Sequence, residues 1–127
     1  MLLVALIAVL FVSACRRSSG ASVTLRGTDT GRTIELKRGD KLIVELEGNP
    51  TTGFQWEAMA LDTAILKQEG DPEWKTDQPG LLGSEVTCTL KFGVLRAGRT
   101  ELRLVYHQPW DKETPPAQTF EVTVVVE

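Results

Sequence analysis

Alternation of apolar and polar residues with a period of two constrains the fold of this chain more than any other feature. It is nearly perfect between Glu85 and Phe92, where apolar and polar side chains exchange at almost every position. This period places the apolar side chains on one face of a half-buried β-strand. In the three clearest segments the residues predicted to face inward are Val86, Cys88, Leu90, Phe92, Leu102, Leu104, Tyr106, Phe120, Val122, Val124 and Val126.

Similar strand patterns recur along the chain, separated by turn residues at short intervals. Strands are expected at 41–47, 54–59, 85–92, 99–106 and 119–127, and residues 23–25 and 33–36 add a first strand or hairpin. A short helical turn with Asp62 as its cap is expected within 62–68. The pattern predicts an all-β protein, an immunoglobulin-like β-sandwich of about seven strands.

Length and charge limit the classes of function. The chain has 127 residues, enough for one core but not two, and its formal net charge is −3, with 14 basic and 17 acidic residues. That balance argues against a nucleic-acid partner. No repeat and no long block of like charge is visible, so neither a repeat array nor a charged tail is indicated. We expect a single domain, acting as a monomer.

Residues 1–14 are predicted to be an export signal that is not part of the fold. An apolar run from Leu2 to Val12 is too short to span a membrane comfortably, and it leads into Val12-Ser13-Ala14-Cys15, which resembles a bacterial lipobox. That resemblance implies cleavage before Cys15, lipidation of this cysteine and anchoring to the cell envelope, on its periplasmic or surface side. Residues 15–21 would then be the lipidated cysteine and a tether, and residues 22–127 the β-sandwich. The alternative is a plain secretory signal with an incidental cysteine, which would give a secreted protein.

The segment Asn49-Pro50-Thr51-Thr52-Gly53-Phe54 interrupts two strand-like runs and is predicted to be a loop at one end of a sheet. Proline fixes its own φ and restricts the residue before it, so Asn49-Pro50 defines the entrance of the turn. Gly53 can supply a positive φ at the exit. Thr51 and Thr52, stiff at χ1, are expected to project outward between them.

Catalysis and metal binding are poorly supported by the sequence. The only histidine is His107, and Cys88 lies in an inward-facing series that predicts a buried, unreactive thiol. Two cysteines and one histidine without ligand-pair spacing do not make a zinc site. We therefore expect no enzyme activity and no cofactor.

Three loops together resemble the chagasin family of cysteine peptidase inhibitors, from about Thr33 to the C-terminus. Asn49 to Phe54, here called the first loop, matches the family's first motif in full. The second loop, Gly80-Leu81-Leu82-Gly83, keeps the outer glycines of a Gly-x-Gly-Gly pattern but carries Leu82 where the family has glycine. In the third loop, His107-Gln108-Pro109-Trp110, Gln108 stands where the family has arginine.

The resemblance implies that the three loops occlude the active-site cleft of papain-like cysteine peptidases. The implied contact residues are Asn49, Pro50, Thr51, Thr52, Gly53, Phe54, Gly80, Leu81, Leu82, Gly83, Gln108, Pro109 and Trp110. Thr51 and Thr52 would lie over the catalytic cysteine and histidine, and Trp110 would be the main aromatic contact. An alternative left open by the sequence is a surface lipoprotein whose end loops bind another ligand or serve envelope structure. Trp110 could also fold back onto the sandwich edge.

Overall fold

The fold follows from a computed structural model that describes residues 20–75 and 86–127. Cys15 and the second loop lie outside these residues. Within the described ranges, no helix has the length and apolar character needed to cross a membrane.

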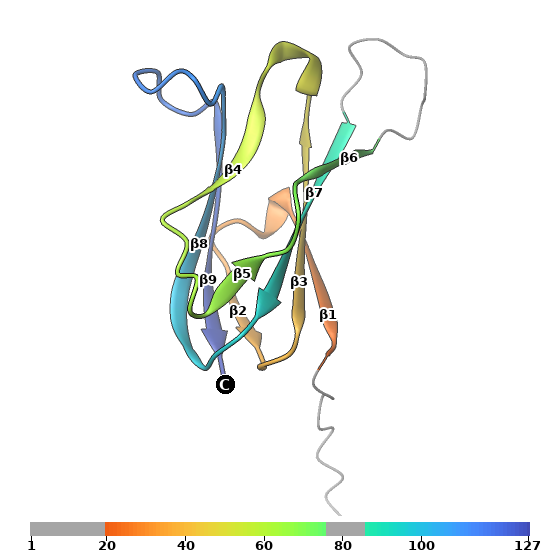
Figure 1. Ribbon diagram of the computed structural model, residues 1–127, viewed down its shortest axis with the longest axis vertical. Helices are drawn as coiled ribbons and strands as arrows, with labels where there is room; N and C mark the ends of the chain where they lie inside the picture. Colours follow the sequence, from red (N-terminus) through yellow and green to blue (C-terminus); the bar gives the residue numbers. More distant parts are fainter. Residues whose placement is uncertain (1–19, 76–85) are drawn as a thin grey trace, which may run out of the picture.

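The described residues form nine strands and two short 3-10 helices (Figure 1). The expected number was about seven; β5 and β6 add to it because three-residue strands are too short to show alternation. The strands are β1 (Ser22–Arg26), β2 (Thr33–Leu36), β3 (Lys41–Gly48), β4 (Gln55–Met59), β5 (Leu66–Gln68), β6 (Glu73–Lys75), β7 (Val86–Val94), β8 (Gly98–His107) and β9 (Gln118–Val126). The helices are η1 (Gly27–Asp29) and η2 (Pro50–Thr52).

The strands form two sheets that face each other, and the predicted immunoglobulin-like sandwich is confirmed. One sheet has the order β1-β3-β7-β5, with β6 also paired to β7, and the other has the order β2-β9-β8-β4. β1 runs parallel to β3 and β2 parallel to β9. Residues 23–25 and 33–36 therefore do not form a hairpin, because they join different sheets. The turn capped by Asp62 is present, with Ala64 N donating to Asp62 Oδ1 at 3.1 Å, but it ends where β5 begins.

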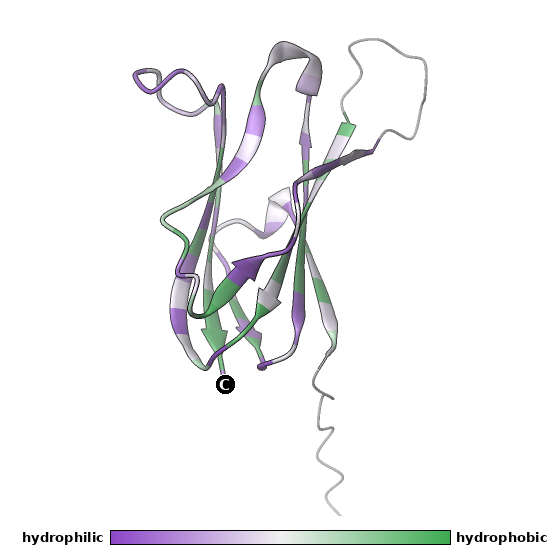
Figure 2. Ribbon diagram, viewed as in Figure 1, coloured by the Kyte–Doolittle hydropathy of each residue, from purple (hydrophilic) through white to green (hydrophobic). Residues whose placement is uncertain are grey.

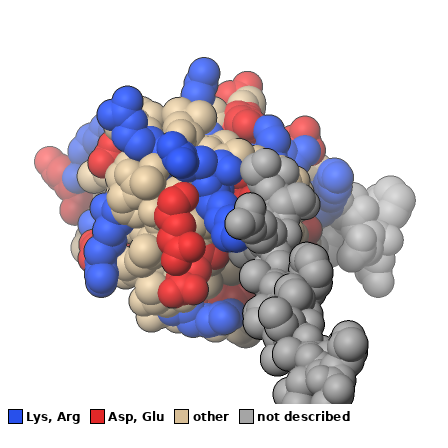
Figure 3. Space-filling model, turned by 90° about the horizontal axis from the view of Figure 1, so that it is seen from below, with Lys and Arg blue, Asp and Glu red and all other residues tan. Residues whose placement is uncertain are grey.

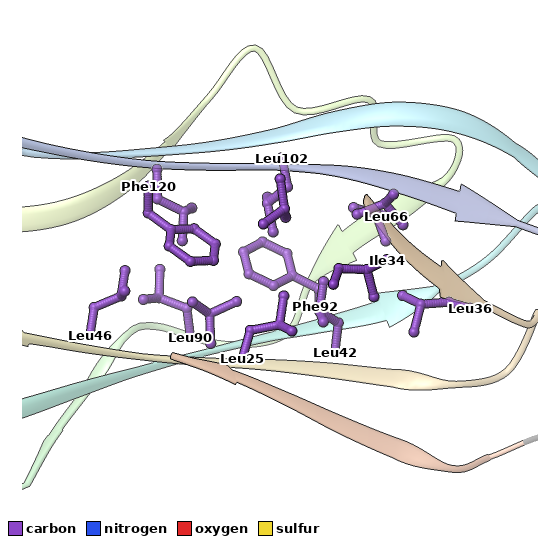
Figure 4. Packing of buried hydrophobic residues seen from close by; sticks show 14 of the residues in the cluster. Leu25, Ile34, Leu36, Leu42, Leu46, Leu66, Leu90, Phe92, Leu102 and Phe120 are labelled. Carbon is purple, nitrogen blue, oxygen red and sulfur yellow. The ribbon is translucent and has the colours of Figure 1, made fainter. Parts of the chain in front are cut away.

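The core lies between the sheets and consists of buried apolar side chains from both. Hydrophobic and hydrophilic residues are interspersed along the strands that supply it (Figure 2). Phe92 of β7 and Phe120 of β9 extend toward each other across the gap, surrounded by leucines from both sheets (Figure 4). All the residues predicted to face inward are buried except Val86, which is half-buried at the start of β7. The buried apolar residues of the described chain lie between Leu25 and Val126. A domain that begins at Ser18 keeps all of them and is used in the experiments below.

The two ends of the sandwich differ in what they carry (Figure 1). At one end lie the connection from β3 to β4 and that from β8 to β9, together with the end of β6 and the start of β7. We call this the loop end. The start of β1 and the C-terminus lie at the opposite end.

Candidate functional site

Strand register brings the first and third loops together at the loop end. Gln55, which follows the first loop, pairs with His107, where the third loop begins. Gly48, which precedes the first loop, pairs with Val86, the first described residue after the second loop. The predicted first and third loops are thus neighbours in space, and β7 begins beside the first loop.

The first loop is a single 3-10 turn stabilised by its own side chains. Asn49 is its N-cap, and Asn49 Oδ1 accepts hydrogen bonds from Thr51 N at 3.1 Å and from Thr51 Oγ1 at 2.6 Å. Thr52 Oγ1 donates to the Asn49 carbonyl at 2.7 Å. Both threonines are exposed, as predicted, but their hydroxyl groups are engaged within the turn.

Gly53 ends this turn in the left-handed region, with φ of 80°. Its N–H donates to the carbonyl of Pro50 at 3.2 Å. A residue with a Cβ would be strained at this φ, so glycine is required by the backbone alone. The predicted roles of the proline at the entrance and the glycine at the exit are confirmed.

Tyr106 of β8 fixes the entrance of the first loop from below. Its hydroxyl accepts a hydrogen bond from Asn49 N at 2.7 Å and donates to the Asn49 carbonyl at 3.2 Å. The ring lies between those of Phe54 and Trp56, with both centroid distances 5.2 Å. Because this aromatic base is packed against the core, the turn stands on a rigid support.

Gly48 makes this close packing possible. A Cβ at residue 48 would lie 3.0 Å from the ring of Tyr106 and 3.1 Å from that of Trp74. Trp74 is half-buried and packs against the core, and Trp56 is buried.

The third loop supports the first loop from the side. Gln108 Nε2 donates to the carbonyl of Thr52 at 3.2 Å, so this residue bonds the first loop itself. The ring of Trp110 reaches the exit of the turn, and a Cβ at Gly53 would lie 2.5 Å from Trp110 Cη2. Trp110 nevertheless remains 69% exposed. Its ring therefore lies against the first loop and presents most of its surface to solvent.

Polar contacts fix the start and the end of the third loop. His107 Nε2 lies 2.7 Å from Glu57 Oε2 on the neighbouring strand β4. Asp111 N donates to the Gln108 carbonyl at 2.9 Å, and Asp111 Oδ1 accepts from the backbone N–H groups of Glu113 and Thr114, both at 3.1 Å. Hydrogen bonds from Thr114 and then Glu113 hold the pKa of Asp111 below its usual value.

Among the described residues, the thiol of Cys88 is not placed for nucleophilic catalysis. Cys88 is fully buried in the core, and burial raises the pKa of its thiol to about 12, which removes the thiolate needed for nucleophilic attack. Within these residues no group of three or more His, Cys, Asp or Glu side chains could hold a metal ion.

The sequence analysis did not identify several residues that support the loops. Gly48, Asp111 and the hydroxyl group of Tyr106 support the loops without belonging to a recognised motif. A signal for Gly48 existed, since a glycine inside a strand pattern indicates a close approach of another group. Nothing in the spacing predicts that Gln108 bonds the backbone of the first loop. The second loop, Gly80 to Gly83, lies outside the described residues.

Comparison with known proteins decides which family carries this arrangement. The sequence model described as "Chagasin family peptidase inhibitor I42" matches residues 35–124. The chain belongs to the chagasin family. It is accordingly a member of a family of peptidase inhibitors and not an enzyme.

Relatives and solved structures agree with this assignment. Amoebiasin-2 of Entamoeba histolytica is 23% identical over 124 residues, covering 93% of this chain and 96% of the relative. The crystal structure of the cysteine protease inhibitor EhICP2 from Entamoeba histolytica superimposes with a TM-score of 0.73 at 22% identity, covering 87% of this chain and 99% of that chain. The structure of PbICP-C in complex with falcipain-2 gives a TM-score of 0.61 at 20% identity, covering 85% and 100%. These likenesses establish the sandwich fold.

Proposed function

We propose that this chagasin-family protein is a reversible inhibitor that fills the active-site cleft of papain-like cysteine peptidases with its three loops. The observation that carries the proposal is the bracing of the first loop by Tyr106, Gln108 and Trp110. A loop that is already ordered loses little conformational entropy when it binds. PbICP-C has the same fold as this chain and forms a complex with falcipain-2. That complex supports a cysteine peptidase as partner.

The mechanism is obstruction of the cleft. In the proposed complex Thr51 and Thr52 lie over the catalytic cysteine and histidine of the peptidase. Because Asn49 and Gly53 close a tight 3-10 turn, the loop departs from the extended backbone that cleavage requires. The exposed ring of Trp110 supplies an adjacent apolar contact. The second loop is proposed to approach the substrate side of the cleft through backbone contacts.

An inhibition assay tests this proposal directly. The domain from Ser18 onward is titrated against papain and a cathepsin-like peptidase, with a trypsin-like serine peptidase as control. We expect reversible inhibition of the two cysteine peptidases and none of the serine peptidase, because the loops are proposed to fit the papain-like cleft. An interface of about 1,600 Å² can support nanomolar affinity. Absence of inhibition by the folded domain at tens of micromolar would overturn the inhibitor proposal in favour of a lipoprotein that binds another ligand. That concentration corresponds to a binding free energy of about −6 to −7 kcal/mol.

We also propose that the protein is exported and anchored to the cell envelope by lipid on Cys15. The support is the lipobox-like Val12-Ser13-Ala14-Cys15 and the apolar run before it. β1 begins at Ser22, which leaves only a short tether between the lipid and the sandwich. The inhibitory proposal does not depend on this anchor.

A further inference from the structure

Basic residues gather at the end of the sandwich opposite the loops. The turn from β2 to β3 and the turn from β7 to β8 meet there, since Gly39 N donates to the Val94 carbonyl and Val94 N to the Asp40 carbonyl. The chain enters at the same place, with Lys41 N donating to the Ala21 carbonyl at 2.9 Å. We call this surface the tether end. Its basic residues are Lys37, Arg38, Lys41, Lys67, Arg96 and Arg99.

The acidic residues of the tether end offset only part of this charge. Lys41 Nζ contacts both carboxylate oxygens of Glu69, at 2.6 and 2.7 Å, and Asp40 is buried. Glu35, Asp62 and Glu127 are other acidic residues in this region. Within the described chain, no ion pair is formed by Lys37, Arg38, Lys67, Arg96 or Arg99. Seen from this end, Lys and Arg side chains cover more of the surface than Asp and Glu (Figure 3).

An exposed leucine lies among these charges. Leu95, in the turn between β7 and β8, is 51% exposed and is followed directly by Arg96. Its backbone is held by a 2.8 Å hydrogen bond from Leu95 N to the Ile65 carbonyl. An apolar side chain flanked by basic ones suits the boundary between phospholipid headgroups and acyl chains.

The loop end has the opposite charge. Its described acidic residues are Glu45, Glu47, Glu57, Glu73, Asp111 and Glu113, and its described basic residues are Arg26, Lys75 and Lys112. The molecule is therefore electrically polar along its long axis, although its net charge is only −3. A negatively charged surface would attract the tether end and repel the loop end.

We propose that the tether end is a docking surface for an anionic phospholipid bilayer. Cys15 precedes Ser22 by seven residues, which span at most about 25 Å, so lipid on that cysteine would hold this end near the membrane. Arg16 and Arg17, directly after the lipidated position, would add to the attraction. Docking turns the loop end away from the bilayer, toward soluble peptidases. The proposal goes beyond peptidase inhibition and does not depend on it.

Vesicle binding by the domain from Ser18 onward tests the docking surface without the lipid. This domain lacks Arg16 and Arg17 but keeps every acidic residue, so its formal net charge falls from −3 to −5. Attraction to anionic lipid then requires a local basic surface. At about 20 mM salt we expect the domain to sediment with phosphatidylglycerol-containing vesicles and not with phosphatidylcholine vesicles, and to dissociate at about 0.5 M salt.

Matched variants separate the tether end from bulk charge. Each Lys or Arg near an anionic surface contributes about 1 kcal/mol, or about fivefold in partitioning. The triple variant Lys37→Gln, Arg38→Gln and Arg96→Gln should bind about a hundredfold more weakly. The control triple Lys75→Gln, Arg103→Gln and Lys112→Gln has the same net charge and should bind within about fivefold of the parent, since its residues lie elsewhere.

Leu95 gives a second, charge-independent test. Leu95→Ser should weaken vesicle binding, whereas Met59→Ser, at an exposed position on the side of the sandwich, should not.

Equal losses in the two triples, or equal binding to neutral and anionic vesicles, would overturn the proposal. Equally tight binding to heparin that is unaffected by Leu95→Ser would assign the surface to a soluble polyanion and overturn it too. Papain inhibition by every variant is measured in parallel, so a failure of docking is distinguishable from a failure of inhibition.

Discussion

The ring of Trp110 covers Gly53 so closely that a Cβ at residue 53 would lie 2.5 Å from Trp110 Cη2. The two residues belong to different loops, and each loop limits the positions available to the other. Because Trp110 is exposed, its ring can move away if the space at residue 53 is filled. A side chain at residue 53 would therefore act in two ways: the positive φ would lower the stability of the loop, and the displaced Trp110 ring would change the shape of the inhibitory surface.

Gly53→Ala tests both effects. The positive φ of 80° should cost about 1–2 kcal/mol of stability, and the displaced Trp110 ring should weaken inhibition. The matched control is Gly31→Ala, at φ of 86° with open space around its Cβ position, which should lose similar stability but inhibit normally. Urea unfolding and papain inhibition constants measure the two effects. Equal inhibition by both variants would show that the contact with Trp110 is unimportant.

Trp110→Ala should weaken papain inhibition by about 1–3 kcal/mol, as expected for an aromatic hot spot. The melting temperature should hardly change, because the side chain is 69% exposed. Leu95→Ala, at a residue 51% exposed in the turn between β7 and β8 at the opposite end of the sandwich, serves as the control and should leave inhibition intact. A sharp fall in melting temperature with a parallel loss of affinity would instead make Trp110 a packing residue.

Tyr106→Phe removes the hydroxyl group that bonds both backbone groups of Asn49. We expect a loss of about 1–3 kcal/mol in stability, since the Asn49 N–H is left without its partner in a partly buried site. Amide exchange at Asn49 should accelerate and inhibition should weaken, because the entrance of the first loop is no longer fixed. Unchanged exchange at Asn49 would contradict this role.

The end of the third loop should withstand mild acid. The lowered pKa of Asp111 means that its stabilising hydrogen bonds are fully present above the ordinary value of 3.8 and are lost as the pH falls through the lower folded value. The amide resonances of Glu113 and Thr114 should therefore stay constant between about pH 7 and pH 4 and shift only in stronger acid. Asp111→Ala should abolish this shift. A shift of these resonances near neutral pH in the wild-type protein would contradict the prediction.

Lipidation of Cys15 can be tested by expressing the full chain in a bacterial host with radiolabelled palmitate. The product should partition with membranes and incorporate labelled palmitate, and Cys15→Ser should abolish both. Because Cys88 is buried and burial raises the pKa of its thiol to about 12, it should not compete for the label. A soluble, unlabelled product would show that Cys15 is incidental and leave the inhibitory proposal intact.

The sequence predicts the sandwich well because alternation with a period of two reports burial directly. Phe92 and Phe120 were assigned to the core from that period alone, and both are buried. The short strands β5 and β6 were missed, since three residues cannot display a period. The sheet membership of β1 and β2 was also beyond local pattern, because each pairs in parallel with a strand that is not its neighbour in sequence.

The motifs of the first and third loops could be recognised, but not the contacts between them. Gly53 was predicted from turn chemistry, which depends only on its own backbone. The bond from Gln108 to Thr52 and the position of Trp110 over Gly53 depend on the register of β4 with β8, which is set by tertiary packing. Such contacts leave no trace in the local sequence.

The parallel pairing of β2 with β9 has a consequence for biosynthesis. Thr33 lies opposite Thr123, so β2 remains without its sheet partner until β9 has been made. Pairing between such distant segments is slow, because a long intervening chain must first be closed into a loop. The four-stranded sheet is therefore complete only after β9 has been made. Until then β8, which carries Tyr106, can pair only with β4, and the aromatic support of the first loop stands on two strands of its sheet.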